Sequence, residues 1–306
     1  MLHVWKVSGD ELVAIPVEEL SNVRILKQRL QTLCGLARFR QRLLVDSATL
    51  ADNAILDCLN VQLVLLPFAD VSAEQQPELT IAAAGGFVED VEEMLQEPRD
   101  PDIAFCGFTA MHAACEHGHT GVVRLLLEAD ADKDKSDRHG RTPLWLASQD
   151  GHSEIVRLLL ESGAKKDHKD HYKRTPLWVA SLRAHLEVVK LLLDSGADTN
   201  IGDTYGRTPL WEAAQSGHTE VVRLLLQAHA VTDDWGDIYH RTPLCEAAQN
   251  GHATIVRLLL EAGAEKDQGD FFGSTPLSLA TDHSHPDVVC LLSDSGSTAT
   301  AHKGAS

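Results

Sequence analysis

Apolar residues recur at a fixed interval over most of the chain, and a similar run of polar and turn residues precedes each recurrence. Aligning the chain on its Thr-Pro pairs gives segments with a period of 33 residues, one of which has an extra residue near Asp233 and Asp234. A degenerate first copy, which retains fewer of the repeated residues, covers 78–97, and a degenerate last copy begins at Gly273. The clear copies cover 107–139, 140–172, 173–205, 206–239 and 240–272. A repeat of this length indicates a stack of similar units.

Each copy predicts two short helices joined by a turn. In the copy at 140–172, Thr142 is placed to cap a helix whose first residue is Pro143, where the missing backbone N–H is not needed. A second apolar stripe starts after Glu154 and ends at Gly163, a residue suited to a left-handed helix end. A helix pair of this size cannot bury its own apolar face. We therefore expect the copies to stack and to form one another's core.

Residues 1–68 do not repeat and follow a different pattern. A helix is predicted between an N-cap at Ser21 and a stop at Gly35. Its inward apolar positions are expected to be Val23, Leu26, Leu30 and Leu33. Short β-rich runs occupy 3–7, 12–17, 41–45 and 61–66. The resulting order, β-β-α-β-β, predicts a small α+β domain.

Charge and composition narrow the classes of partner. The 306 residues carry a formal net charge of −18, which repels phosphate backbones and disfavours nucleic acids and anionic membranes. We see no run of the roughly 18–20 apolar residues that a membrane span needs, and no signal-peptide pattern. The six cysteines lack metal-ligand spacing, which indicates free thiols in a reducing compartment. We expect a monomeric cytoplasmic protein, with the nucleus as the alternative compartment.

The 16 histidines and 45 acidic residues prompt a search for catalysis and metal binding. Six of the histidines occupy one slot per copy, four of them after a glycine and His185 and His285 in altered form, and this spacing predicts a row along the stack rather than a cluster. The sequence has no nucleophile elbow, phosphate-binding glycine loop, dinucleotide motif or His-Glu-x-x-His. We therefore expect no enzyme, no cofactor and no metal site. A hydrolase or transferase, the competing class, requires histidines and carboxylates gathered in one cavity.

The residues just before each Thr-Pro pair form the candidate binding surface. A ring-bearing residue stands two positions before an arginine in most copies, so stacking predicts two parallel stripes of the residue types that anchor protein interfaces. The alternative is that the arginines only pair with the aspartates of the same loops, namely Asp137, Asp170, Asp203 and Asp237. The candidate loop residues are His139, Arg141, Tyr172, Arg174, Tyr205, Arg207, Tyr239, Arg241, Phe271 and Phe272, and the helix positions expected on the same side are Gln149, Arg183, Gln215 and Gln249.

The repeated part resembles the ankyrin-repeat family, on the strength of Thr-Pro-Leu-x-x-Ala, of Gly-His followed by an apolar second helix, and of Gly-Ala-Asp at a period of 33. The resemblance implies an all-α solenoid with projecting β-turn fingers and a concave surface that binds other proteins. Trp145, Trp178 and Trp211 stand where the family has a histidine, and we expect them to form a packing ladder. Lys173 and His240 replace a turn glycine, which leaves the geometry of those two fingers open.

The order of elements in the head, with Gln-Arg-Leu-Leu-Val at 41–45 and Val-Gln-Leu-Val-Leu-Leu at 61–66, resembles a ubiquitin-like domain of the β-grasp fold. The positions that match ubiquitin's partner-binding patch are Leu44, Gln62 and Val64, whereas Ser8 replaces a leucine of that patch. The last strand runs into a short linker without the terminal di-glycine of a conjugatable ubiquitin. The resemblance therefore implies an integral domain, either a docking module or a packing domain.

The predicted organisation is a ubiquitin-like domain at 1–68, a linker at 69–77, an ankyrin-repeat solenoid of about seven units at 78–298 and a disordered tail at 299–306. The function expected from it is a non-enzymatic scaffold or adaptor, whose repeats bind a protein partner through their concave and finger surface. The alternative is an adaptor of the ubiquitin pathway. In that case the head docks on proteasome or ligase machinery while the repeats select the client.

Overall fold

The structure is a computed structural model of the chain, and it describes residues 1–16, 20–56, 60–67, 76–97, 99–105, 107–234 and 236–294. The predicted tail at 299–306 and residues 69–75 of the predicted linker lie outside the described residues. The chain forms two compact units, Met1–Arg138 and His139–Ser306. The first unit thus contains the non-repeating head together with the two N-terminal helix pairs.

The head is a five-stranded mixed sheet covered on one face by a helix. The strand order is β2-β1-β5-β3-β4, in which β1 and β5 are parallel and the other neighbours are antiparallel. This arrangement is compatible with the predicted β-grasp. The elements are β1 Leu2–Lys6, β2 Glu11–Ile15, α1 Val23–Cys34, the 3-10 helix η2 Arg38–Arg40, β3 Gln41–Val45, β4 Ala48–Thr49 and β5 Asn60–Leu65.

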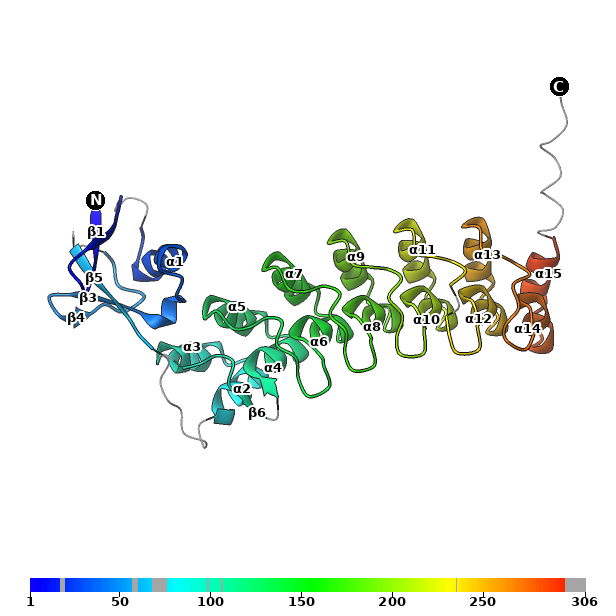
Figure 1. The fold of residues 1–306 in the computed structure, drawn as a ribbon, viewed down its shortest axis with the longest axis horizontal. Coiled ribbons are helices and arrows are strands. Elements are labelled where there is room, and N and C mark those ends of the chain that lie inside the picture. Colours follow the sequence, from blue (N-terminus) through cyan, green and yellow to red (C-terminus); the bar gives the residue numbers. More distant parts are fainter. Residues whose placement is uncertain are drawn as a thin grey trace, which may run out of the picture. The chain divides into compact units, whose positions relative to one another are not determined.

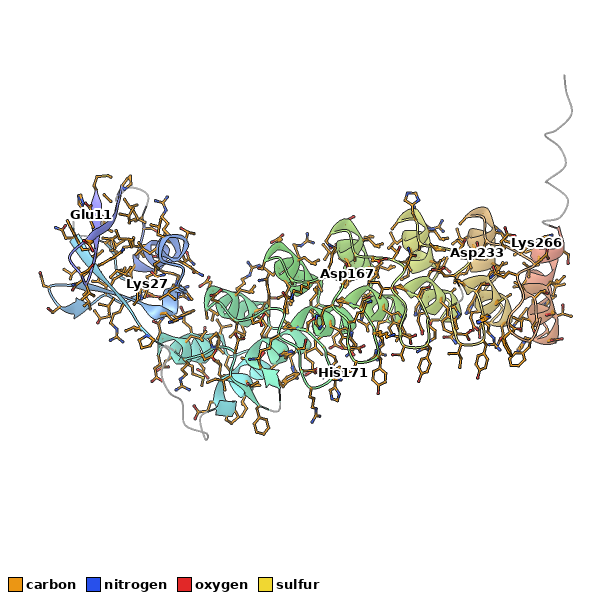
Figure 2. All side chains as sticks on the ribbon, viewed as in Figure 1. Glu11, Lys27, Asp167, His171, Asp233 and Lys266 are labelled. Atoms are coloured by element: carbon orange, nitrogen blue, oxygen red, sulfur yellow. The ribbon has the colours of Figure 1, made fainter. Side chains whose placement is uncertain are left out.

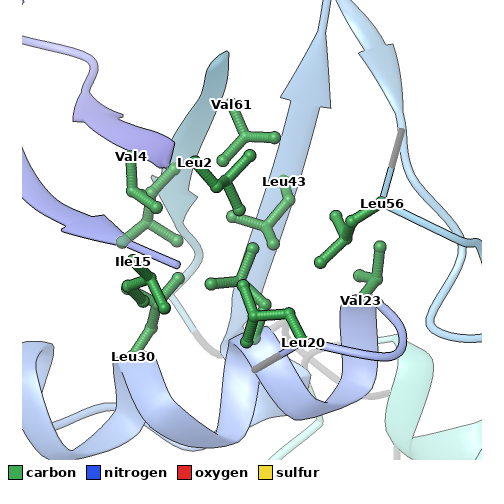
Figure 3. Close-up of a cluster of buried hydrophobic side chains, with 11 residues drawn as sticks. Leu2, Val4, Ile15, Leu20, Val23, Leu30, Leu43, Leu56 and Val61 are labelled. Atoms are coloured by element: carbon green, nitrogen blue, oxygen red, sulfur yellow. The ribbon is translucent and has the colours of Figure 1, made fainter. Parts of the chain in front are cut away.

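The core of the head lies between α1 and the sheet (Figure 3), where alternate strand residues such as Val4 and Leu43 share one buried cluster with Leu30 of the helix. Two details of the prediction were wrong. Asn22 rather than Ser21 caps α1, because the Asn22 Oδ1 accepts the backbone N–H of Ile25 at 3.0 Å. Leu33 is 53% exposed, because the buried cluster ends one turn earlier at Leu30.

Two helix pairs follow the head within the first unit. The first helices α2 and α4 pack together, as do the second helices α3 and α5. Thr109 caps α4 in a capping box that is completed by Nδ1 of His112, the residue that retains the family histidine. The elements are α2 Gln76–Gly85, α3 Val88–Gln96, β6 Ala104–Phe105, β7 Phe108–Thr109, α4 Ala110–Glu116 and α5 Thr120–Glu128.

One buried arginine joins the head to these helix pairs. The side chain of Arg38, in η2, has 0% exposed surface, and its guanidinium pairs with Asp52 of the head. The same guanidinium reaches Glu92 of α3 at 3.0 Å and Glu128 of α5 at 2.6 Å. Three carboxylates from three segments therefore share one cation. The head is fixed to the first two repeats by this contact and is not merely tethered to them.

Asp52 supplies the head's own carboxylate to this contact. The Lys27 ammonium, which is also buried, lies 2.7 Å from the other oxygen of Asp52. Burial alone would raise the pKa of Asp52, but the hydrogen bond and charge of Lys27 and the charge of Arg38 lower it below its usual value. Asp52 is therefore ionised at neutral pH, as the shared ion pair requires.

The second unit is a stack of helix pairs, with the first helices in one row, the second helices in another, and the loops between pairs projecting past the first row (Figure 1). Each first helix begins as predicted, with a threonine N-cap and a proline at the first helical position, as at Thr142 and Pro143. None of the helices that the structure describes has both the length and the apolar character to cross a bilayer. The helices are α6 Pro143–Gln149, α7 Ser153–Glu161, α8 Pro176–Leu182, α9 Leu186–Asp194, α10 Pro209–Gln215, α11 Thr219–Gln227, α12 Pro243–Gln249, α13 Ala253–Glu261, α14 Pro276–Asp282 and α15 Pro286–Asp294.

The tryptophans of the first helices connect neighbouring repeats. The indole N–H of Trp145 donates to the carbonyl of Arg174 in the next repeat at 3.2 Å, and that of Trp178 donates to the carbonyl of Arg207 at 2.7 Å. Trp211 makes the same bond to the following repeat at 3.1 Å. The rings themselves are at most 3% exposed. The predicted packing ladder is confirmed, and each of its steps also carries a hydrogen bond.

The histidines just before the second helices, which follow a glycine or, at His185 and His285, an alanine or a serine, form a second connection at the other end of the first helices. Each ring bonds through Nε2 to a backbone carbonyl near the end of the preceding first helix, so it belongs to the stack rather than to a pocket. In the second unit, His185, His218, His252 and His285 bond to the carbonyls of Gln149, Leu182, Gln215 and Gln249 at 3.0–3.1 Å.

The fingers are tight turns whose geometry is kept at both positions that lack a glycine. In one finger the Lys173 N–H donates to the carbonyl of Asp170 at 2.8 Å, and the Asp170 N–H donates to the carbonyl of Arg174 at 3.1 Å. Lys173 and His240 adopt the left-handed conformation of the absent glycine, with φ of 63° and 61°. The β-turn fingers implied by the resemblance are therefore present in these repeats as well.

Adjacent fingers are also bonded to each other through the backbone. The Thr204 N–H donates to the carbonyl of Tyr172 at 2.8 Å, and the Phe271 N–H donates to the carbonyl of Tyr239 at 2.7 Å. The projecting loops are thus held on one side by the tryptophans and on the other by their neighbours. This leaves them little freedom to rearrange.

We predict that Arg38→Ala lowers the free energy of unfolding of the first unit by about 2–4 kcal/mol, because three carboxylates then lose a shared buried cation. Hydrogen–deuterium exchange of the amides in α3 and α5 should rise together with that of the head, and the melting temperature should fall. Arg42→Ala, which removes an exposed arginine of β3, is the control and should leave both measurements unchanged. If the amides of α3 and α5 exchanged in the Arg38→Ala variant as slowly as in the wild type, the role assigned to this contact would be contradicted.

Candidate functional site

The ends of the fingers in the second unit expose a row of large aromatic and aliphatic side chains. We define the finger stripe as Tyr172, Tyr205, Ile238, Tyr239, Phe271 and Phe272, which are 44–70% exposed. At its C-terminal end the rings touch, with centroids 5.9 Å apart for Tyr239 and Phe272 and 5.6 Å apart for Phe271 and Phe272. An exposed row of large apolar side chains is a typical mark of a binding surface.

The arginines beside this stripe are held within the repeats. Nε and Nη2 of Arg174 lie 2.8 and 2.7 Å from the buried carboxylate of Asp170. Arg207 pairs with Asp203 in the same way, through an Nε contact of 3.0 Å. Only 27% of each arginine side chain is exposed. The pairing of arginines with finger aspartates is therefore present in these two repeats, and Arg207 in addition pairs with Glu212.

Each of these guanidinium groups also lies between aromatic rings. The guanidinium carbon of Arg174 is 5.0 Å from the ring centroid of Tyr172, 5.2 Å from that of Trp145 and 5.7 Å from that of Trp178. Arg207 repeats the arrangement, 5.2 Å from the ring of Tyr205. The guanidinium groups thus stabilise the positions of the exposed tyrosine rings through cation–π contacts. The two predicted stripes become one exposed aromatic stripe on a row of largely structural arginines.

The remaining predicted residues of the second unit lie next to the stripe. His139 is exposed on the finger that precedes α6, where its carbonyl accepts the backbone N–H of His171 of the next finger at 3.0 Å. Arg141 is half-buried, with its guanidinium carbon 5.7 Å from the ring centroid of Trp145. Both residues therefore continue the pattern of the later fingers.

The predicted helix positions fall into two adjacent rows rather than one. Gln149, Gln215 and Gln249 are the last residues of their first helices, and all three are half-buried. Arg183 is the exposed C-cap residue of α8, one position further along, so that Leu182 is the equivalent of the glutamines in that repeat. The structure therefore places Arg183 beside this row and not in it.

Two buried glutamates adjoin the fingers and were not singled out from the sequence. Glu212 and Glu246 are each 2% exposed and occupy the helix position that is Leu146 in an earlier repeat. Nη1 of Arg207 lies 2.9 Å from Oε1 of Glu212, and Nη1 of Arg241 lies 3.2 Å from Oε1 of Glu246. A charged residue at a position that is apolar in other copies was the signal that could have identified them.

The carboxylate of Glu212 is only partly compensated. Although Arg207 is at ion-pair distance, no hydrogen bond from the described residues reaches Oε1. Burial raises the pKa of Glu212 to about 7; the charge of Arg207 opposes this rise, and the charges of Asp203 and Glu246 add to it. Burial also raises the pKa of Glu246, against the hydrogen bond from Arg241. The Glu212 carboxyl therefore changes charge near neutral pH.

The groups that an enzyme would need are distributed along the stack. The slot histidines bond to carbonyls of different repeats, so they are spaced one per repeat and do not meet carboxylates in one cavity. Over the described part of the chain, no three His, Cys, Asp or Glu side chains gather where they could hold a metal ion. The thiols of Cys115 and Cys245 are buried, which raises the pKa of each and disfavours the reactive thiolate.

The outer face of the head's sheet is a separate exposed surface. Leu44, Gln62 and Val64 all point away from the core, and Leu44 pairs directly with Gln62 across β3 and β5. Trp5, which was not predicted, pairs with Gln62 across β1 and β5 and lines a shallow cavity of about 300 Å³ with it. Ser8 instead bonds to Asp10 in its own turn. The three predicted patch residues therefore share one face, with an aromatic ring added beside them.

We predict that Glu212→Gln makes the second unit less sensitive to pH. A buried acid with a raised native pKa destabilises the fold as pH rises from its unfolded pKa, near 4.5, through its native pKa of about 7. Relative to wild type, the variant should therefore gain on the order of 1–2 kcal/mol of stability at pH 8 and little at pH 5. Thermal denaturation at both pH values measures the difference.

The matched control for this prediction is Glu220→Gln on the second helix α11, because that carboxylate is 61% exposed and pairs with Arg223 at 3.4 Å. It should shift stability equally and slightly at both pH values. A Glu212 variant whose stability follows the wild-type pH profile would show that this carboxyl stays ionised in the fold.

Comparison with known proteins bears on the repeated part of the chain. The family model described as ankyrin repeats (3 copies) matches residues 79–170, 165–235 and 230–302. Ankyrin repeats are generally protein–protein interaction modules.

Individual relatives match over shorter stretches. The mouse (Mus musculus) ankyrin repeat and SOCS box protein 16 is 36% identical over 73 residues, which are 24% of this chain and 16% of that protein. The rat (Rattus norvegicus) cortactin-binding protein 2 is 42% identical over 66 residues, 21% of this chain and 4% of that protein. The Schizosaccharomyces pombe ankyrin repeat-containing protein P1E11.10 is 35% identical over 71 residues, 23% of this chain and 34% of that protein. The chain thus spans only about a third or less of the length of these relatives.

The family match covers most of the chain and agrees with the stacked helix pairs and their β-turn fingers, so the chain belongs to the ankyrin-repeat family.

Proposed function

We propose that the protein is a monomeric, non-enzymatic scaffold or adaptor of the cytoplasm or nucleus, and that its repeats bind a protein partner through the finger stripe and the adjoining ends of the first helices. The observation that carries this proposal is the stripe itself, six large side chains that are 44–70% exposed in one row. Tyrosine and phenylalanine are enriched in the binding surfaces of proteins, where they bury a large area for few rotatable bonds.

The supports beneath the stripe favour binding without rearrangement. The tyrosines lie over arginines that are paired with buried aspartates, as in the group of Tyr172, Arg174 and Asp170. The backbone under them is bonded to the preceding repeat by the indoles and to the neighbouring fingers by main-chain hydrogen bonds. A surface that is already ordered loses less conformational entropy when a partner binds. The stripe is thus suited to a partner that meets several repeats at once.

The test is affinity capture from cell extract with wild-type chain and with Tyr205→Ala/Tyr239→Ala, followed by quantitative mass spectrometry. Proteins that bind the stripe should be recovered at least tenfold less by the double variant, because each truncated aromatic anchor costs about 1–2 kcal/mol of binding energy. The control, Lys190→Ala/Arg223→Ala, changes two exposed residues of the second helices α9 and α11. Equal recovery of every captured protein by all three chains would remove the finger stripe as the binding surface.

A second candidate function concerns the head, and the exposed sheet face of Leu44, Gln62, Val64 and Trp5 is the observation that favours it. In this proposal the head is a ubiquitin-like docking module that binds proteasome or ligase components while the repeats select the client. The five-stranded sheet with one covering helix is compatible with that fold. The buried Arg38 contact uses η2 and the loop of Asp52, so it leaves the outer sheet face exposed.

Leu44→Arg tests this second candidate, because it places a charge at the centre of the sheet face without touching the core. Proteasome and ubiquitin-ligase subunits captured by wild-type chain should be lost from the Leu44 variant and kept by Tyr205→Ala/Tyr239→Ala. Arg29→Ala, which changes an exposed residue of α1 on the opposite side of the sheet, is the control and should retain them. Capture that is unchanged by Leu44→Arg would leave the head with a packing role only.

A further inference from the structure

The tips of the fingers change in chemical character along the second unit. The first tip pairs an imidazole with a phenol, and Figure 2 shows His171 at the projecting end of that finger. Later tips lose the ionisable group and gain apolar surface, until the last tip presents two phenyl rings that are 70% and 68% exposed. In chain order the tips are His171 and Tyr172, Thr204 and Tyr205, Ile238 and Tyr239, and Phe271 and Phe272.

The charge of the finger segments changes in the same direction. The segment 165–174 contains five Lys or Arg residues and two carboxylates, whereas 265–274 contains one lysine and three carboxylates. The segments between them, 198–207 and 231–241, each contain one arginine, with two and three carboxylates. Lys266, the single cation of the last segment, lies near the second helices and away from the projecting ends (Figure 2). Lys165 and Lys166 stand at the equivalent end of the first segment, so the cations next to the first tip are Lys169, Lys173 and Arg174, whereas residues 267–276 around the last tip contain no lysine or arginine.

Two of the cations in the first segment are available to a ligand. The side chains of Lys169 and Lys173 are exposed, and neither ammonium has an ion-pair partner among the described residues. Together they line a cavity of about 470 Å³ against the next finger. The carboxylates that share this cavity are Asp203, which is paired with Arg207, and Asp234. Two unpaired ammonium groups at the edge of a strongly acidic protein favour an anionic group of a partner.

The separation of the two ends follows from the spacing of the fingers. Each finger is a turn with two backbone arms, and two of the three steps between these fingers are closed by main-chain hydrogen bonds. Two strand spacings of about 4.8 Å give about 10 Å per finger, and hence about 30 Å between the Lys169 finger and the Phe272 finger. An extended peptide covers that distance with about nine residues, at about 3.3 Å per residue.

We propose that the finger stripe selects an extended peptide segment of a partner protein that is acidic at one end and carries large apolar side chains, without acidic residues, about nine residues away. The acidic end lies over Lys169 and Lys173, and the apolar end lies over Ile238, Phe271 and Phe272. The reverse arrangement is disfavoured because the acidic end would then meet the last finger, where no lysine or arginine lies within four residues of Phe271 or Phe272. This inference rests on the proposed function, since it names the chemistry of the partner at the same surface.

The probe is a phage-displayed library of random 16-residue peptides, selected against the full chain. Enriched peptides should contain an acidic cluster and a pair of large apolar residues separated by about nine positions. Lys169→Glu/Lys173→Glu should weaken synthesised copies of these peptides at least tenfold, and Lys169→Gln/Lys173→Gln should weaken them less. Phe271→Ser/Phe272→Ser should weaken them to a similar degree without reducing the salt dependence of binding, because it leaves the charged end intact.

Two measurements keep the test specific. Lys190→Glu/Arg223→Glu makes the same double charge reversal on exposed cations of the second helices and should leave peptide affinity unchanged. Melting curves of all variants identify any loss of peptide affinity that comes from unfolding. If Lys169→Glu/Lys173→Glu unfolds, the affinity of Lys169→Gln/Lys173→Gln decides the test.

The outcomes separate this inference from the proposed function. Peptides that bind the wild-type chain and fail to bind Tyr205→Ala/Tyr239→Ala, but lack the acidic and apolar ends or tolerate both lysine variants, overturn the inference and leave the proposed function standing. If every enriched peptide binds Tyr205→Ala/Tyr239→Ala normally, or if no peptide is enriched, the finger stripe does not bind peptides. That result overturns the inference and also the proposed function as far as peptide partners are concerned.

Discussion

The hydrogen bond from a tryptophan indole to the next finger connects the core of each repeat to the surface of its neighbour. First helices of seven residues and second helices of nine are too short to be stable alone, so each pair depends on stacking for its structure. Trp178, for example, fills the space between repeats and fixes the carbonyl of Arg207 at 2.7 Å. That bond positions the arginine, and the arginine supports the exposed tyrosine beside it. The candidate binding surface is therefore a direct extension of the core.

Buried charge has opposite consequences in the two units. In the first unit the guanidinium of Arg38 is surrounded by three carboxylates, and Lys27 balances the remaining oxygen of Asp52, so the charges compensate. In the second unit Glu212 is buried beside an arginine that is already shared with Asp203, and its pKa rises to about 7. The first arrangement fixes the head to the first two repeats through compensated ion pairs. The second leaves a carboxyl whose charge state depends on pH close to the fingers.

Much of the fold was predictable because the sequence repeats its local signals. Threonine caps, prolines at the first helical position and left-handed turn positions recur every 33 residues, and the structure places helices at each of them. The candidate surface was predictable in position but not in the roles of its members, because sequence spacing does not show that Asp170 captures the guanidinium of Arg174. The contact of Arg38 with Glu92 and Glu128 was beyond prediction, since its partners are 54 and 90 residues away and belong to no repeated pattern.

The last finger shows how the surface is maintained where the usual supports are missing. The position that holds an arginine beside the earlier fingers is Ser274 here, and the preceding first helix offers Cys245 instead of a tryptophan. The thiol of Cys245 lies 3.7 Å from the carbonyl of Gln268 and makes a weaker hydrogen bond than an indole N–H. The finger is held instead by the bond from the Phe271 N–H to Tyr239 and by ring contacts of Phe272 with Tyr239 and of Phe271 with His240. Loss of the cation–π support thus coincides with a change from tyrosine to phenylalanine, so the apolar end of the stripe is stabilised by the same rings that it exposes.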